Sequence, residues 1–247
     1  MSSEPSVPSA ASAKYAQFGA TETISLTQIQ KLTGEYLSRS WASIPHVTHH
    51  DYADVTALEQ ARINVRQNTT RRVTSLAFHV KAVVAALQKF PKFNASLDQA
   101  VGVVYLKKYF NIGIAIDTPK GLLVAVVRDA DRKGIVDIAV EIDTLASKAR
   151  SKGLSAKEMS GGSFSISSLG RNGGTGFSPI INAPEVAILG TSRLEDRAVR
   201  CDSGVGWITT LPLSLSYDHR VINGAEAAAF MIHLTTVLRD VAPTWAG

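Results

Sequence analysis

The sequence lacks the features that would place the chain outside the cell or in a membrane. It contains one cysteine, Cys201, so no disulfide can form within the chain, and a reducing compartment is indicated. No apolar run approaches the roughly 18–20 residues of a membrane-spanning helix, and no signal-peptide pattern opens the chain. We therefore expect no membrane partner and a cytoplasmic protein, or a protein of the mitochondrial matrix if the source is eukaryotic.

Motifs for nucleotides, nucleic acids and metals are also missing. The glycine-rich residues 170–176 lack the Lys-Ser/Thr ending of a phosphate-binding loop, and no Gly-x-Gly-x-x-Gly follows a strand. The net charge of +5 is spread along the chain without interleaved aromatic residues, so we expect no nucleic-acid partner. His46, His49, His50 and Asp51 lie close together, but their spacing is not that of a standard zinc site, and we expect no metal.

Composition divides the chain into a short linker and one domain. Residues 1–22 open on an Ala-, Pro- and Ser-rich stretch, which predicts an extended or disordered segment. No later segment has the composition of a linker, so residues 23–247 are expected to form a single domain.

Apolar spacing predicts alternating helices and strands. Helices are expected from about residue 29 to the break at 43–45, at 56–65, 76–87 and 135–149, and after 224. Strands are expected at 101–106, 110–116, 122–127, 163–168, 185–191 and 207–217. Thr56 and Glu59 have the spacing of a capping box. This order favours an α/β fold with a mixed sheet covered by helices.

The most informative segment is residues 216–226, SYDHRVINGAE. Apolar residues at alternate positions of 211–217 predict a half-buried strand, and a helical pattern begins after Gly224. His219 is therefore expected in a strand-to-helix connection, between an acid and a guanidinium, where loops often carry chemistry. That position makes His219 a candidate general base, although spacing alone leaves a purely structural histidine equally open.

The segment Asp218-His219-Arg220, followed by Gly224, resembles the D-H-R-x-x-x-[DN]-G signature of the dihydrolipoyl acyltransferases, the core subunits of 2-oxo acid dehydrogenase complexes. Four further segments resemble the family in the same order: 44–48 (IPHVT), 117–123 (DTPKGLL), 162–170 (GSFSISSLG) and 181–190 (INAPEVAILG). The sequence of residues 212–225, PLSLSYDHRVINGA, is most similar to the pyruvate branch of the family, whose acyl group is acetyl.

The resemblance implies a chloramphenicol acetyltransferase-like two-layer sandwich and a dihydrolipoyllysine-residue acetyltransferase, which moves an acetyl group between coenzyme A and a dihydrolipoyl group. It implies that His219 is the general base and that Ser167 donates a hydrogen bond to the oxyanion. Without the resemblance, we would interpret Ser167 as one of several serine hydroxyls at a strand edge, with no role in catalysis. Asn223 stands where many members have aspartate, and it is implied to orient a neighbour without charge.

Three more residues are expected to support this site. Asp218 and Arg220 form an ion-pairing frame for the loop, and Gly224 permits a special backbone geometry or a close approach.

The family also implies partners. Its members work as homotrimers or larger trimer-based cores, together with lipoyl domains and other dehydrogenase complex subunits. Residues 1–22 look like the end of a swinging-arm linker, and we expect the lipoyl group to come from another domain or chain. Residues 242–247 replace the aliphatic stub that commonly joins trimers, which predicts a lone trimer, although Trp245 could anchor an interface instead.

Two alternatives remain. A non-catalytic scaffold subunit is disfavoured because both His219 and Ser167 are present. A small-molecule acetyltransferase of the chloramphenicol type shares the fold and a histidine, but its motif typically reads H-H-x-x-x-D-G, which Asp218 does not match.

Overall fold

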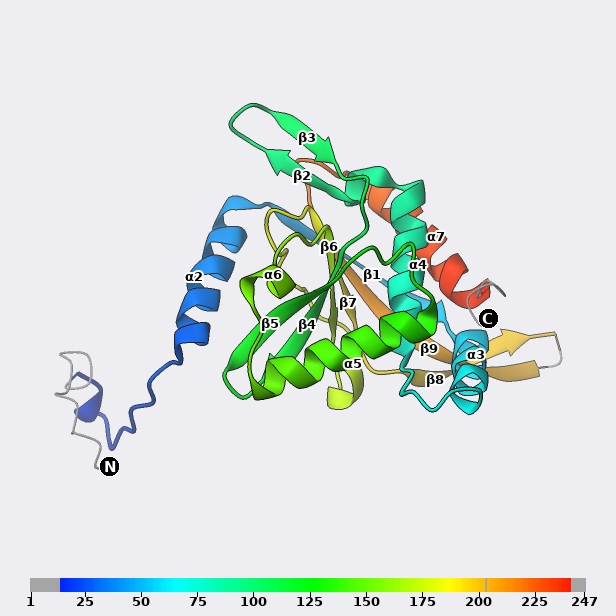
Figure 1. Ribbon diagram of the computed structural model, residues 1–247, viewed down its shortest axis with the longest axis horizontal. Coiled ribbons are helices and arrows are strands. Elements are labelled where there is room, and N and C mark those ends of the chain that lie inside the picture. Colours follow the sequence, from blue (N-terminus) through cyan, green and yellow to red (C-terminus); the bar gives the residue numbers. More distant parts are fainter. Residues whose placement is uncertain (1–13, 203, 241–247) are drawn as a thin grey trace.

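A computed structural model describes residues 14–202 and 204–240 (Figure 1). The expectations for residues 1–13 and for the tail with Trp245 fall outside these ranges. The helices are α2 (Gln28–Ser43), α3 (Thr56–Gln67), α4 (Ser75–Lys89), η1 (Pro91–Phe93), α5 (Ile135–Ser151), α6 (Ala156–Met159), η2 (Gly170–Asn172) and α7 (Gly224–Asp240). The strands are β1 (His46–Asp54), β2 (Ala95–Asp98), β3 (Val103–Leu106), β4 (Ile112–Thr118), β5 (Gly121–Val127), β6 (Phe164–Ser168), β7 (Ala187–Thr191), β8 (Glu195–Cys201) and β9 (Gly204–Asp218).

Most strands form one mixed sheet in the order β1-β9-β7-β6-β4-β5, and β8 pairs with β9. Strand β6 runs parallel to β4 and β7, while the other pairs are antiparallel. Strands β2 and β3 form a separate hairpin that projects from the body (Figure 1). The mixed sheet covered by helices confirms the predicted α/β class.

The two faces of the sheet differ in chemistry. Alternate residues of β9, from Leu211 to Tyr217, join the main core with Phe78, Phe164 and Phe230 from the helices and β6. The opposite face carries rows of hydroxyls and a second small apolar cluster, Ile44, Ile181 and Ile188. The strand predicted at 207–217 is confirmed as part of β9, but the expectation that it is half-buried was wrong, because the serines on the polar side, Ser214 and Ser216, are both fully buried.

Helix ends were only partly predicted. Helix α3 begins at Thr56 as expected, but the capping box is wrong, because Glu59 binds Arg62 and Ser75 instead. Thr56 is held by Asp54, whose Oδ1 accepts from its backbone and side chain. Capping boxes form elsewhere, at the starts of α2 and α6.

Apolar spacing did not predict strands β1, β2 and β8. The residues of β8 alternate between half-exposed and exposed, so no apolar pattern marks this strand. The strand expected from residue 101 starts instead at Val103, because Gly102 turns the chain with a φ of 70°.

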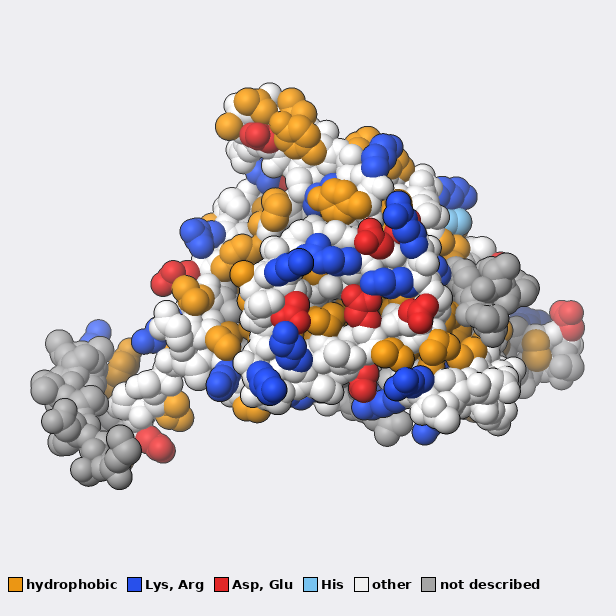
Figure 2. All heavy atoms as spheres, viewed as in Figure 1, with side chains coloured by type: hydrophobic (Ala, Val, Ile, Leu, Met, Phe, Trp, Pro, Cys, Tyr) orange, Lys and Arg blue, Asp and Glu red, His pale blue; other side chains and the backbone are white. Residues whose placement is uncertain are grey.

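The described ranges contain no helix with both the length and the apolar character required to cross a bilayer. On the face that Figure 2 shows, lysine and arginine side chains are interspersed with acidic ones, as the spread of charge along the sequence predicted.

His79 on α4 is a buried histidine within the hydrophobic core. Its side chain is 5% exposed, and neither ring nitrogen has a hydrogen-bond partner within the described residues. Burial lowers its pKa from 6.5 to about 4, with nearby Glu59 acting weakly in the opposite direction. The folded protein therefore holds this ring neutral.

We expect this histidine to make the fold acid-sensitive. His79 binds a proton at a higher pH in the unfolded chain than in the folded one. Its contribution to the free energy of unfolding is therefore complete above pH 6.5 and is lost as the pH drops toward 4. The loss amounts to about 3 kcal/mol. His79→Leu should flatten this part of the profile in denaturant unfolding at constant protein concentration, whereas His50→Gln, at an exposed position, should not. An unchanged pH slope in His79→Leu would contradict the assignment.

Candidate active site

His219 lies in the connection between β9 and α7, as predicted. Its backbone N–H donates to the carbonyl of Pro45 at 3.1 Å, which ties the loop to the start of β1. The ring is exposed, its centroid lies 5.9 Å from that of Tyr217, and the imidazole makes no hydrogen bond to any described residue. The imidazole is therefore available to accept a proton from a ligand.

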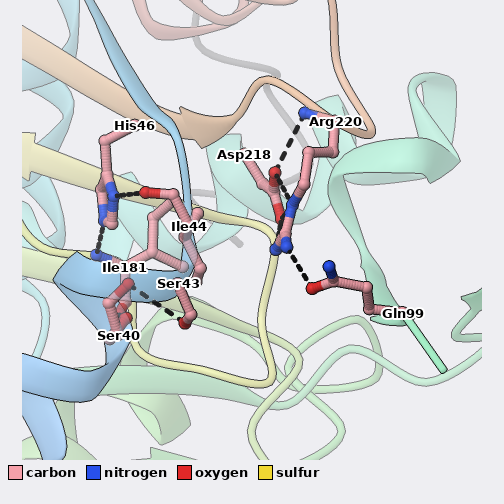
Figure 3. A network of polar contacts seen from close by, with 8 residues as sticks. All are labelled: Ser40, Ser43, Ile44, His46, Gln99, Ile181, Asp218 and Arg220. Atoms are coloured by element: carbon pink, nitrogen blue, oxygen red, sulfur yellow. Dashed lines mark hydrogen bonds and ion pairs between the residues drawn. The ribbon is translucent and has the colours of Figure 1, made fainter.

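The loop is wound around Asp218, which is only 2% exposed. The backbone carbonyl of Asp218 accepts from the amides of Val221 and Ile222, and its Oδ1 accepts from the amide of Arg220. The Arg220 guanidinium binds the same carboxylate through Nε and NH2 at 2.7–3.2 Å (Figure 3). These bonds raise the pKa of Arg220. The pair thus has the ion-paired geometry that the sequence led us to expect.

Asn223 and Gly224 begin α7. The Asn223 Oδ1 accepts from the amide of Glu226 at 2.9 Å, while the Asn223 amide donates to the Glu226 carboxylate at 3.2 Å, so both residues cap the helix. The expectation for Gly224 was wrong. Its φ is not positive, and an added Cβ would meet only the Tyr217 hydroxyl at 4.0 Å, an ordinary contact.

Ser167 lies on β6, on the polar face of the sheet. It pairs with Gly190 on β7, which in turn pairs with Ser214 on β9. The ring of Phe177 lies so close to Gly190 that a Cβ there would be 2.7 Å from it, so any larger residue would displace the ring. The Ser167 side chain is half-buried and bonds to no described residue, which leaves its hydroxyl free to donate.

A hollow of about 330 Å³ lies where β1, β9 and the loop after β6 meet. It is lined by His50 to Tyr52, residues 175–178 and Leu213. His50 Nδ1 meets the Ser214 hydroxyl at 3.0 Å, and the Phe177 amide points at the same hydroxyl from 3.4 Å. The glycine-rich loop after β6 therefore folds over the serine side of the sheet.

Two residues before Ser167, Ser165 belongs to a buried polar network whose role the sequence did not suggest. Asn182 Nδ2 donates to the Ser165 hydroxyl at 3.3 Å and to Glu185 at 3.2 Å, and the Tyr36 hydroxyl of α2 donates to Asn182 and to the carbonyl of Ala183. Burial raises the pKa of Glu185 to about 7, against the hydrogen bond from Ser165 and the charge of Lys107. The network holds β6 to the segment before β7. Asn182 and Glu185 lie in the segment 181–190, which resembles the family, but the resemblance assigned neither residue a role.

Within one chain, Ser167 and His219 do not come together. Ser167 is level with Ser214, whereas His219 follows β9 five residues later. At the usual rise and spacing of strands, that is about 16 Å along the sheet and about 10 Å across it. A single chain therefore cannot place both side chains on one small reacting group.

The histidines near residue 46 do not form a metal site. Successive strand residues point to opposite faces, so His46 and His50 are separated from His49 and Asp51. His46 Nε2 accepts from the Ile181 amide at 3.0 Å and Nδ1 contacts the Ile44 carbonyl at 2.8 Å, which occupies both ring nitrogens (Figure 3). Ser40 also holds Ile181, through its carbonyl, at 2.6 Å. Across the described ranges no group of three potential ligands could hold a metal ion.

The fold and the histidine loop define the catalytic domain of an acyltransferase. The chain belongs to the family described as 2-oxoacid dehydrogenases acyltransferase (catalytic domain), whose sequence model matches residues 18–244. A relative from Cupriavidus necator, the dihydrolipoyllysine-residue acetyltransferase component of pyruvate dehydrogenase complex, is 51% identical over 92% of this chain and 41% of its own length. The component of the same name from Haemophilus influenzae is 44% identical over 92% and 41%. The chain thus spans about two fifths of the length of these relatives.

Solved structures agree with this assignment. The dihydrolipoamide acetyltransferase of Azotobacter vinelandii is 43% identical, with a TM-score of 0.89, and the match covers 96% of this chain and 98% of that one. That enzyme was studied for the roles of a serine, a histidine and an asparagine in its catalytic mechanism. The cubic core of a pyruvate dehydrogenase multienzyme complex has the same TM-score at 44% identity, over 96% and 98%. A chloramphenicol acetyltransferase, at 16% identity and a TM-score of 0.52 over 83% and 94%, confirms the predicted fold alone.

Proposed function

We propose that this chain transfers an acetyl group between coenzyme A and a dihydrolipoyl group, as the catalytic core of a pyruvate dehydrogenase complex. One observation carries the proposal. Ser167, His219 and Asn223 are the same three residue types, at the same intervals along the chain, as the serine, histidine and asparagine studied in the Azotobacter enzyme. The free imidazole and free hydroxyl of the first two support catalytic roles for them.

The proposed reaction follows from thiol chemistry. A free thiol has a pKa near 8.5, so attack at neutral pH needs a base to remove the proton. His219 accepts that proton as the sulfur of one thiol attacks the thioester carbonyl. The Ser167 hydroxyl donates a hydrogen bond to the resulting oxyanion. When the tetrahedral intermediate collapses, the other sulfur leaves and takes the proton back from the imidazolium, so the base is regenerated.

Asn223 has a positional role in this proposal. Its side-chain oxygen caps α7 directly after the histidine loop and so fixes where the loop meets the helix. It carries no charge that could stabilise an imidazolium.

The proposed assembly follows from the separation of Ser167 and His219. A complete site needs the histidine of one copy and the serine of another, which a closed symmetric assembly supplies when every copy gives one group and receives one. We infer that this assembly is a homotrimer. The cubic core of the related complex supports a trimer-based assembly. A lipoyl domain, which carries the dihydrolipoyl group, and the other complex subunits are the remaining proposed partners.

The direct test is an acetyl-transfer assay. Purified protein is given acetyl-CoA with either free dihydrolipoamide or chloramphenicol as the acceptor. Acetyl-dihydrolipoamide as the main product supports the proposal. Transfer to the hydroxylated acceptor alone would instead indicate an antibiotic acetyltransferase, and no transfer to either would indicate a scaffold.

Substrate preference gives a second expected result: acetyl-CoA should react faster than succinyl-CoA. The reason is the similarity of residues 212–225 to the pyruvate branch, together with the cost of burying the unpaired carboxylate of a succinyl group. Values of kcat/KM for the two donors, measured with the same acceptor, decide the matter. A higher value for succinyl-CoA would place the chain with enzymes of 2-oxoglutarate.

A further inference from the structure

The β2–β3 hairpin is linked to the histidine loop by one side chain. Gln99, in the turn of the hairpin, accepts a hydrogen bond through Oε1 from NH1 of Arg220 at 2.7 Å (Figure 3). Within the described residues, this is the polar side-chain contact that joins residues 98–102 to the rest of the chain. This hydrogen bond therefore connects the turn of the hairpin to the loop that carries His219.

The hairpin has little else to hold its outer end. Val101, Val103, Tyr105 and Leu106 are between 42% and 64% exposed. Figure 2 shows these apolar side chains gathered on the part that projects from the body. At the base, Asn94 fixes the hairpin through the carbonyls of Lys107 and Tyr109. The turn itself is closed only locally, by Asp98 accepting from the two amides that follow Gln99.

All three guanidinium nitrogens of Arg220 make hydrogen bonds. Nε and NH2 bind the buried carboxylate of Asp218, and NH1 binds Gln99. Because an arginine fork is planar and rigid, a partner on NH1 also fixes the direction from which the other two nitrogens approach Asp218. Asp218 in turn organises the backbone turn on which His219 lies.

We propose that Gln99 is a positioning residue that acts through Arg220 to hold His219 in its reactive place. This inference rests on the proposed function, since His219 is the base of that reaction. The Gln99 side chain is a neutral amide that neither gives nor takes a proton in the reaction, so it acts through position alone. It narrows the range of loop conformations, so its loss lowers the fraction of time in which the imidazole is placed to accept a proton.

The test begins with Gln99→Ala. We expect kcat for acetyl transfer to fall about 3- to 10-fold, the size of one exposed hydrogen bond, with KM for both substrates within about twofold of the wild type. Gln99→Glu keeps an acceptor at the same place and makes the bond to Arg220 charge-assisted, so it should retain at least the wild-type kcat at low salt. Val101→Ala, in the same turn, removes apolar surface without touching the contact and should leave kcat unchanged.

A double-mutant cycle shows whether Gln99 works through Arg220. The compact ammonium of Arg220→Lys lacks the planar fork that presents separate nitrogens to Asp218 and Gln99, so Gln99→Ala should cause no further loss in that background. Melting temperatures of all variants check that the fold is intact.

Each outcome is decisive. A normal kcat in Gln99→Ala, an equal loss in both backgrounds, or a loss confined to KM would overturn the inference and leave the proposed function standing. A wild-type protein that makes no acetyl-dihydrolipoamide would overturn both.

Discussion

His219→Ala should lower the rate of acetyl transfer by about 10²–10⁴-fold, with the protein still folded. The imidazole is exposed and makes no hydrogen bond within the described residues, so its removal leaves no buried group without a partner. What holds the loop is the backbone of residue 219, which bonds to Pro45, and the Asp218 carboxylate. Alanine keeps both, and the loss should therefore appear in kcat.

The matched control is His233→Ala on α7. His233 packs near Phe90 with a ring distance of 5.8 Å, and its removal should cost stability without affecting the chemistry. Raising the pH should partly restore His219→Ala, because more of the thiol is then ionised without a base. Near-normal turnover of folded His219→Ala at neutral pH would rule out the proposed base.

Much of the fold could be predicted because it depends on apolar periodicity. The regular spacing in α4 and α5, and the alternation in β9, reflect burial against one core, and the structure confirms all three elements. Strand β8 could not be found in this way, because none of its residues is buried and pairing with β9 makes it a strand. The full burial of Ser214 was missed for a similar reason: its partners, His50 and the Phe177 amide, come from distant segments.

The candidate site was predicted residue by residue from a resemblance, and the physical arrangement came only from the structure. Spacing placed His219 in a loop, but whether its ring makes a hydrogen bond to a described residue depends on what surrounds that loop, and only the structure shows that it makes none. The hydrogen bond between Gln99 and Arg220 joins residues 121 positions apart, so no local sequence pattern could predict it. The expectation for Gly224 failed because a glycine in a motif was taken to signal unusual geometry, whereas the backbone there is ordinary helix.

The separation of Ser167 and His219 leads to the sharpest expected result, which concerns mixed assemblies. Ser167→Ala should lower turnover by about 10²–10³-fold on its own, because a donor to the oxyanion is lost. His219→Ala is at least as damaging. If each site uses the histidine of one chain and the serine of the next, an assembly of both variants regains sites in which neither residue is altered.

Counting sites in a ring gives the size of the effect. A trimer with two copies of one variant and one of the other has one interface at which an intact histidine faces an intact serine. Co-expressing the variants with two different tags, and purifying trimers that carry both, should therefore restore about one third of the wild-type activity. Trimers of two differently tagged His219→Ala chains, purified in the same way, are the control and should stay inactive. Doubly tagged mixed trimers with no more activity than either parent would mean that Ser167 and His219 act within one chain. The β9–α7 loop would then have to rearrange to close the roughly 16 Å that separates the two residues along the strand direction.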